Sequence, residues 1–223
     1  MPREELPRAV AQSAPFDNVH FLIVDFETVN PARSPARPIE VAVVALDLTV
    51  APKELGQFSS LMRPTGGCVV TTFDLNQTGI SQRDVDAALS DIEVMEAFEA
   101  FAAPHDPFVL VAHNASFERA ILRQYVSQCE ALCSARLLDS VLLAKHVLPG
   151  LKSYSLDNLW LALGLPKVAN RHRALPDARA TARLLVELLA RWGSYGQLPT
   201  LRQLTDVAQL RGLTHVAEQS SLF

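Results

Sequence analysis

Residues 19–28 read VHFLIVDFET, and this stretch decides the fold. Its first six residues are mostly apolar and partly β-branched, and the run is too short for a buried helix, so it predicts a buried strand. Asp25 and Glu27 stand two positions apart at the end of the run. Successive side chains of a strand point to opposite faces, so these two carboxylates share one face. The stretch therefore predicts a buried strand that ends in a pair of acidic side chains.

The acidic pair calls for a positive counter-charge. Two unit charges about 4 Å apart repel by about 4 kcal/mol at an effective dielectric of 20. A divalent metal ion is the natural counter-charge where only oxygen ligands are offered. Acidic residues at a strand end are also common as plain surface polarity, so the pair of Asp25 and Glu27 alone is open to both interpretations.

The neighbouring segments predict a mixed sheet. Residues 40–48 (EVAVVALDL) read as a second buried strand and residues 57–62 as a weaker third, after a proline-containing loop at 30–38. This order predicts an antiparallel start to the sheet. Two further strands are expected at 108–112 and 136–138, where strands and helices alternate. We therefore expect an α/β fold with a central mixed five-stranded sheet flanked by helices.

Helices are expected where apolar residues recur at helical spacing or where capping residues stand. The segment 65–78 has little periodicity and is left without a helix. The expected helices are 91–102, 115–129 capped by Asn114, 140–147, a helix capped by Ser155, a long helix with Pro176 in its first turn and Gly193 past its end, and one short helix within 197–209.

Length and composition bound the domain organisation and the class of protein. The chain has 223 residues, of which 20 are Lys or Arg and 24 are Asp or Glu, which gives a net charge of −4. This fits one globular domain with an appendage. We expect a loose leader at 1–17, the domain at 18–195 and a C-terminal extension at 196–223. The slight acidity argues against a protein that coats duplex DNA through a large basic face, but not against an enzyme that grips one nucleic-acid end.

Membrane insertion and export are not expected. No run approaches 18 apolar residues, and the first twenty residues contain no apolar core. A transmembrane helix and a signal peptide would need these features. We therefore expect a cytoplasmic protein without a membrane partner.

Two later segments place acidic and histidine side chains at helix starts. Asp177 lies in the first turn of the long helix, and His172 precedes it by five residues. A histidine beside metal-binding carboxylates can accept a proton from a water molecule held by the metal. Residues 113–118 (HNASFE) follow a strand and open a helix, which places Glu118 one turn into it. Taken singly, these residues read equally well as helix-start charge, an inert loop histidine and an exposed helix glutamate.

In this order the segments DFET, HNASFE and HRALPD resemble the motifs of the DEDDh 3′-to-5′ exonucleases. This DnaQ-like family, which includes the proofreading epsilon subunit of bacterial DNA polymerase III, shows D-x-E-T, H-N-x-x-F-D and H-x-x-x-x-D. The resemblance extends to RPIEVAVVAL, QTGIS and SYSLDNLWLALGL and spans roughly residues 19–192. It implies an RNase H-like fold and the histidine subclass. One position departs, because Glu118 stands where the family usually has aspartate.

The resemblance implies two-metal hydrolysis that releases nucleoside monophosphates from DNA 3′ ends, in proofreading or repair. Two Mg²⁺ or Mn²⁺ ions would be held by Asp25, Glu27, Glu118 and Asp177, and His172 would act as general base. The substrate would be a single-stranded or frayed 3′ end. The residues expected to contact it are Phe26, Thr28, Asn114, Phe117 and Arg173, the last of which could instead be simply solvent-exposed.

The last five residues, QSSLF at 219–223, resemble short peptides that dock on the bacterial sliding clamp. Gln219, Leu222 and Phe223 would be the anchor residues, although the same end could fold back on the domain. Two other functions stay open. An exoribonuclease of the same fold is one, because nothing in the sequence distinguishes a preference for the ribose of RNA from one for the deoxyribose of DNA. An inactive adaptor that binds a clamp or polymerase is the other, because of Glu118.

Overall fold

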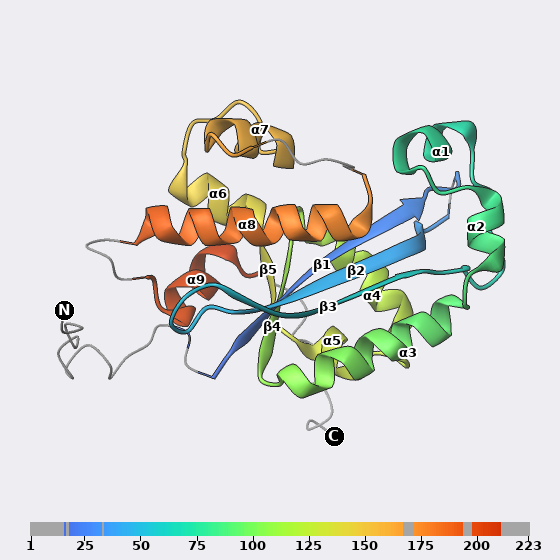
Figure 1. Cartoon of the computed structure of the whole chain (residues 1–223), viewed down its shortest axis with the longest axis horizontal. Coiled ribbons are helices and arrows are strands. Elements are labelled where there is room, and N and C mark those ends of the chain that lie inside the picture. Colours follow the sequence, from blue (N-terminus) through green and yellow to red (C-terminus); the bar gives the residue numbers. More distant parts are fainter. Residues whose placement is uncertain (1–15, 17, 33, 167–171, 194–197, 211–223) are drawn as a thin grey trace, which may run out of the picture.

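The structure is a computed structural model that describes residue 16 and residues 18–32, 34–166, 172–193 and 198–210. A five-stranded sheet in the order β3-β2-β1-β4-β5 forms its centre (Figure 1). The strands are β1 (His20–Val29), β2 (Arg37–Asp47), β3 (Lys53–Leu61), β4 (Phe108–Ala112) and β5 (Leu137–Asp139).

The predicted mixed sheet with an antiparallel start is confirmed. β1 pairs antiparallel with β2, and β2 pairs antiparallel with β3. β1 runs parallel to β4, and β4 parallel to β5. The carboxyl ends of the three parallel strands therefore meet at one edge of the sheet. In the β1–β2 register, Glu27 lies directly opposite Glu40.

Helices cover both faces of the sheet (Figure 1). One face carries α6 (Ser140–Val147), α7 (Leu156–Ala162) and α8 (Ala174–Trp192), and the other carries α3 (Asp91–Ala102), α4 (Ser116–Leu122) and α5 (Glu130–Ser134). The expected helices at 91–102 and 140–147 and the long helix ahead of Gly193 are confirmed. In the part of the chain described, no helix is both long and apolar enough to cross a membrane.

The alternation of side chains along β1 explains how the strand serves two cores. Phe21 and Ile23 pack in the cluster that includes α8, whereas Leu22 and Val24 pack in the cluster that includes α3. Such a strand reads as a continuous apolar run because both of its faces are covered. Asp25 continues the series that faces α8, so its carboxylate points to the side of the sheet on which that helix lies.

Two short helices, α1 (Thr72–Thr78) and α2 (Gln82–Ala87), lie beyond the end of β1, in a region left without helices by the sequence analysis (Figure 1). Their signal is in the caps rather than in the periodicity. Each begins with a capping box, formed by Thr71 with Asp74 in α1 and by Ser81 with Asp84 in α2. Such reciprocal bonds satisfy the free N–H groups that a short helix cannot satisfy itself.

The expectation of one helix over 115–129 is wrong. α4 ends at Leu122, a 3₁₀ turn (Arg123–Tyr125) follows, and α5 begins only at Glu130. The turn directs Tyr125 inward, where its hydroxyl donates a hydrogen bond of 2.9 Å to Asp91 Oδ2. Asn114 is not the cap, because it adopts a left-handed conformation (φ 65°) and the helix starts from Ala115 without a side-chain cap.

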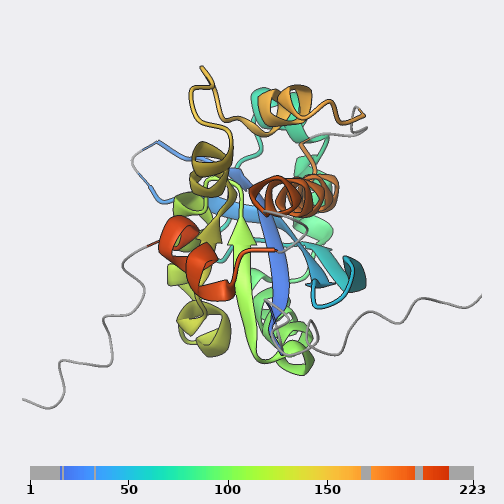
Figure 2. The ribbon, with the colours of Figure 1, turned by 90° about the vertical axis from the view of Figure 1, so that its left-hand side faces the viewer.

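The first part of the predicted extension at 196–223 packs on the domain. α9 (Leu201–Ala208) contacts α6 and β5 (Figure 2), and Leu204 is fully buried in the core cluster that includes α8. After α9, the N–H of Leu210 donates a hydrogen bond of 2.9 Å to the carbonyl of Leu137 in β5. Of the predicted leader at 1–17, the structure describes Phe16, whose side chain is buried against Phe21.

Truncation of Leu204 tests whether α9 belongs to the folded body. We expect Leu204→Ala to lower the free energy of unfolding by about 2–5 kcal/mol, the usual cost of removing a fully buried leucine side chain. Arg202→Ala, at an exposed position of the same helix, serves as the control. Urea denaturation of both variants gives the comparison. Equal stabilities would show that α9 is not part of the cooperative unit.

Candidate active site

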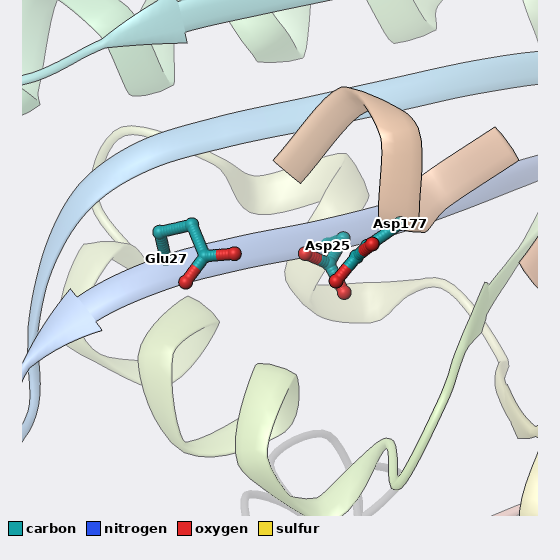
Figure 3. A group of neighbouring side chains, drawn as sticks. All are labelled: Asp25, Glu27 and Asp177. Carbon is teal, nitrogen blue, oxygen red and sulfur yellow. The ribbon is translucent and has the colours of Figure 1, made fainter. Parts of the chain in front are cut away.

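Three carboxylates from two elements converge at the edge of the sheet. Asp25 and Glu27 come from β1, and Asp177 comes from the first turn of α8 (Figure 3). One oxygen of each lies within 4.8 Å of the other two. Asp177 is buried, and the β1 carboxylates are half-buried. The structure therefore brings together three of the four acidic residues expected from the sequence.

The local fold explains why these three residues meet. Asp25 and Glu27 share the face of β1 that looks toward α8, and the start of that helix lies over the end of the strand. The backbone N–H of Asp177 donates to the carbonyl of Arg173, which forms the first turn. The backbone N–H of His172 donates a hydrogen bond of 3.3 Å to Asp177 Oδ2. Negative charge is also favoured at a helix N-terminus.

The donor set fits a divalent metal ion. The three side chains offer only carboxylate oxygens, the ligand type that Mg²⁺ and Mn²⁺ prefer. Three like charges so close together are unfavourable without a cation between them. Asp25, Glu27 and Asp177 are therefore the residues that could hold an ion here.

Glu118 on α4 is buried, which rules out an exposed helix glutamate. Burial raises its pKa to about 8, and the negative charge of Asp139 adds to the effect. Among the residues that the structure describes, its Oε2 has no hydrogen-bond partner. Within the described ranges Glu118 is outside the group of oxygens that lie within 4.8 Å of one another. A buried carboxylate oxygen with no hydrogen-bond partner would be satisfied by a cation or a water molecule.

The raised pKa of Glu118 gives a pH-dependent test of its environment. The folded protein keeps this proton up to about pH 8, whereas the unfolded chain releases it near 4.5. Wild-type stability should therefore fall as the pH rises through this window. We expect Glu118→Gln to remove that fall, so that its melting temperature without metal increasingly exceeds that of wild type between pH 5 and 8.5. Parallel melting curves across this range would contradict the assignment.

The same variants report on metal use. We expect Glu118→Gln to need about 10- to 100-fold more Mn²⁺ for half-maximal activity, the usual effect of losing a supporting group at a metal site. Glu118→Asp should keep substantial activity, because it keeps the charge. An unchanged Mn²⁺ requirement in the Gln variant would remove Glu118 from the site.

The two residues before α8 differ sharply in their surroundings. His172 is exposed and adopts a left-handed backbone conformation (φ 67°). Arg173 forms a bidentate ion pair with the buried Glu40, with Nη2 to Oε1 at 2.7 Å and Nε to Oε2 at 3.0 Å. These hydrogen bonds, with the negative charge of Glu27 and Asp84, raise the pKa of Arg173. The guanidinium is therefore held by the protein rather than freely exposed.

A small hollow adjoins the carboxylates and contains most of the expected substrate-binding residues. Its volume is about 230 Å³. The predicted residues Phe26, Thr28 and Phe117 line it together with Glu27, and the other lining residues are Asn30, Phe73, Asp74, Gln77 and Thr78. Asn114 is not among the lining residues, and its side-chain oxygen accepts a hydrogen bond of 3.4 Å from Ser116.

The hollow also reveals residues that the sequence analysis missed. Phe73 on α1 is 73% exposed at the hollow, which is unusual for a large aromatic side chain. A second hollow of about 670 Å³ adjoins the first through the shared residues Asn30 and Asp74. The capping box at Thr71 and Asp74 was the available signal for α1, and hence for the position of Phe73.

An exonuclease family model, RNase_T, matches residues 22–185. Among curated proteins, the PolC-type DNA polymerase III of Thermotoga petrophila is 28% identical over 214 residues, which cover 93% of this chain and 15% of that protein. The DNA polymerase III epsilon subunit of Treponema pallidum is 28% identical over 203 residues, which cover 86% of this chain and 90% of that protein. The chain thus spans 11–15% of the length of these PolC-type polymerases.

A solved structure shares the fold. The nuclease domain of 3′hExo, described as a DEDDh family member bound to rAMP, superposes with a TM-score of 0.68. The alignment covers 80% of this chain and 94% of that chain at 19% sequence identity. The likeness confirms the expected RNase H-like architecture, with its mixed five-stranded sheet between layers of helices.

Proposed function

Since the chain belongs to the RNase_T exonuclease family, as its DEDDh-like motifs predicted, we propose that it is a metal-dependent 3′-to-5′ exonuclease acting on DNA ends. The single observation that carries this proposal is the convergence of Asp25, Glu27 and Asp177 within 4.8 Å. Divalent cations at the reacting phosphate can stabilise the attacking and leaving oxygens of hydrolysis, and this cluster is where the described part of the chain gathers carboxylates that could hold them. The similarity to DNA polymerase III subunits supports DNA as the substrate and proofreading or repair as the context.

In the proposed reaction, Asp25, Glu27 and Asp177 would hold divalent cations, and the buried Glu118 would support the site. When bound, a pair of such ions stabilises the attacking and the leaving oxygen of phosphodiester hydrolysis. His172 accepts a proton from the attacking water as general base. The water attacks phosphorus, the bond to the 3′ oxygen of the preceding nucleotide breaks, that oxygen takes up a proton from solvent, and a nucleoside monophosphate leaves.

The hollow beside Glu27 is the proposed place of the terminal nucleotide. Phe73 and Phe117 line it and offer aromatic faces, on which bases of any sequence can stack. Thr28 and Gln77 offer polar groups to a sugar or a base edge. Stacking without base-specific hydrogen bonds suits an enzyme that removes any nucleotide. The half-exposed position of the β1 carboxylates next to this hollow would leave the terminal phosphodiester within reach of the cluster.

The direct test follows a 5′-labelled single-stranded DNA oligonucleotide in the presence of Mg²⁺ or Mn²⁺. We expect a ladder that shortens by single nucleotides from the 3′ end and stops when a chelator is added. The same oligonucleotide with a blocked 3′ end is the control. Internal fragments, or cleavage that survives chelation, would contradict the proposal. A wild-type protein that cuts nothing but still binds DNA would favour the inactive adaptor.

An exoribonuclease is the second candidate. The observation in its favour is the structural similarity to a DEDDh domain solved with rAMP. Matched DNA and RNA oligonucleotides in one competition experiment separate the two substrates, because a protein distinguishes them through contacts to the 2′-hydroxyl. We expect faster degradation of the DNA strand, and of a mismatched over a paired 3′ end. Faster loss of the RNA strand would reassign the enzyme.

Docking on a bacterial sliding clamp through QSSLF is a further part of the proposal. Gln219, Leu222 and Phe223 lie outside the described residues, so the support is the sequence resemblance alone. Two apolar anchors at the end of an extended peptide are typical of such docking. Surface plasmon resonance against immobilised clamp should show binding that is lost in the Leu222→Ala/Phe223→Ala double variant. Equal binding by both proteins would exclude this peptide.

A further inference from the structure

Glu40 is an unusual residue for its position in β2. It is a glutamate between the apolar residues Ile39 and Val41, and its side chain is only 4% exposed. It lies opposite Glu27 in the β1–β2 register, so both side chains are on the face toward α8. A buried carboxylate is unfavourable unless it is paired and hydrogen-bonded. Its contacts therefore indicate what it does.

Among the described residues, the side-chain hydrogen bonds of Glu40 lead to the start of α8. Oε1 accepts from Nη2 of Arg173 at 2.7 Å, and Oε2 accepts from Nε of the same residue at 3.0 Å. Oε2 also accepts from the backbone N–H of Ala174 at 3.0 Å. Ala174 is the first residue of α8, whose N-cap Arg173 makes no side-chain cap. The carboxylate of Glu40 thus caps the helix from a neighbouring strand.

The same contacts continue to the metal-binding carboxylate. The carbonyl of Arg173 accepts the backbone N–H of Asp177 at 3.1 Å. The backbone N–H of His172 donates to Asp177 Oδ2 at 3.3 Å. Arg173 is therefore linked directly to both proposed site residues. His172, the proposed base, precedes it in the chain, and Asp177, a proposed metal ligand, is hydrogen-bonded to its carbonyl. A displacement of Arg173 would move both of them relative to β1.

We infer that the Glu40–Arg173 ion pair is a positioning clamp, which fixes the start of α8 so that Asp177 and His172 face the carboxylates of β1. This inference rests on the proposed function. Arg173 is then a positioning residue that acts through Asp177 and His172, and not a phosphate contact. A bidentate guanidinium–carboxylate pair suits this role because it fixes direction as well as distance.

The chain offers a matched control on the same helix. Arg179 lies on α8 and pairs with Glu54 of β3 at 3.4 Å, with both side chains about half exposed. This second pair also ties α8 to the sheet, but it lies away from the first turn. Glu54→Gln and Arg179→Met therefore remove a helix-to-sheet ion pair without touching the start of α8.

The experiment compares Glu40→Gln and Arg173→Met with these controls, using isothermal titration with Mn²⁺ alone and steady-state kinetics on a DNA oligonucleotide. We expect both clamp variants to weaken Mn²⁺ binding and lower kcat, each by about 10- to 100-fold, the usual effect of losing a group that orients metal ligands. KM for the oligonucleotide should change less than about threefold, because uniform substrate binding is retained. The control variants should match wild type in all three quantities.

A phosphate contact predicts a different pattern. If Arg173 met the substrate directly, Arg173→Met would raise KM, whereas Glu40→Gln would free the guanidinium and leave KM unchanged or lower. If Glu40→Gln kept the Mn²⁺ affinity and the kcat of wild type, the proposed positioning role of the Glu40–Arg173 ion pair would also be overturned. Arg173→Lys keeps the charge but loses the fork. It should show an intermediate defect, and it serves as the folded variant if Glu40→Gln does not fold.

Hydrogen exchange separates failure of the clamp from failure of the proposed function. In the metal-free protein, the backbone amides of residues 174, 175, 177 and 178 should exchange faster in Glu40→Gln and in Arg173→Lys than in Glu54→Gln, and Pro176 between them has no amide hydrogen. This readout needs neither activity nor metal. If the Glu40 and Arg173 variants exchanged faster but wild type cut no oligonucleotide, the positioning role of the ion pair would stand and the proposed nuclease activity would be rejected. If their exchange were unchanged and wild type were active, only the positioning role would be rejected.

Discussion

Replacement of Asp177 by alanine is expected to abolish cleavage while the fold is kept. Asp177 is the one carboxylate of the cluster that comes from α8, so its loss leaves only the two ligands from β1. A bound ion contributes several kcal/mol to stabilising the transition state. A loss of about 5 kcal/mol corresponds to a rate lower by about 10⁴-fold. Asp25→Ala should have an effect of the same size.

The stability of the Asp177→Ala variant distinguishes a site residue from a structural one. Removal of one of three clustered carboxylates relieves like-charge repulsion in the metal-free protein, so its melting temperature should equal or exceed that of wild type. With Mn²⁺ the order should reverse, because wild type gains stability from binding and the variant gains little. Asp157→Ala, in the first turn of α7 and exposed, is the matched control. A variant with near-normal turnover would refute the site.

The sheet was predictable because its signals are local. The run of residues 19–28 contains both the apolar strand and the acidic pair, and the β1–β2 and β2–β3 pairings follow from the short connections between strands. The short helices α1 and α2 were not predictable in this way, because hydrophobic periodicity is weak in helices of six or seven residues. Their capping boxes carry the information instead.

The candidate site was predictable only as a set of acidic residues and a histidine. The convergence of Asp25 and Asp177 follows from the packing of α8 on β1, over 150 positions apart in sequence, and no local pattern contains that. The sequence around Glu40 contains no sign of its partner Arg173, which lies 133 positions away. The burial of Glu118 is equally hidden, since a helix glutamate is usually exposed.

Removal of the imidazole at position 172 is expected to lower kcat by about 10²- to 10⁴-fold, the usual contribution of a general base. The backbone conformation of His172 decides which substitution is suitable. Its φ of 67° lies in the left-handed region, which glycine adopts without strain and alanine does not. His172→Gly therefore removes the side chain without disturbing the backbone hydrogen bond from residue 172 to Asp177.

Rescue by added imidazole separates a base from a structural residue in His172→Gly. Added imidazole should restore part of the activity of this variant, because the exposed position of His172 leaves room for a small base to enter from solvent. His146→Ala, on α6 and packed against Trp192, is the control, and added imidazole should not change its activity. If imidazole left the activity of His172→Gly unchanged, another group would take the proton, and the role of residue 172 would be reduced to its backbone bond with Asp177.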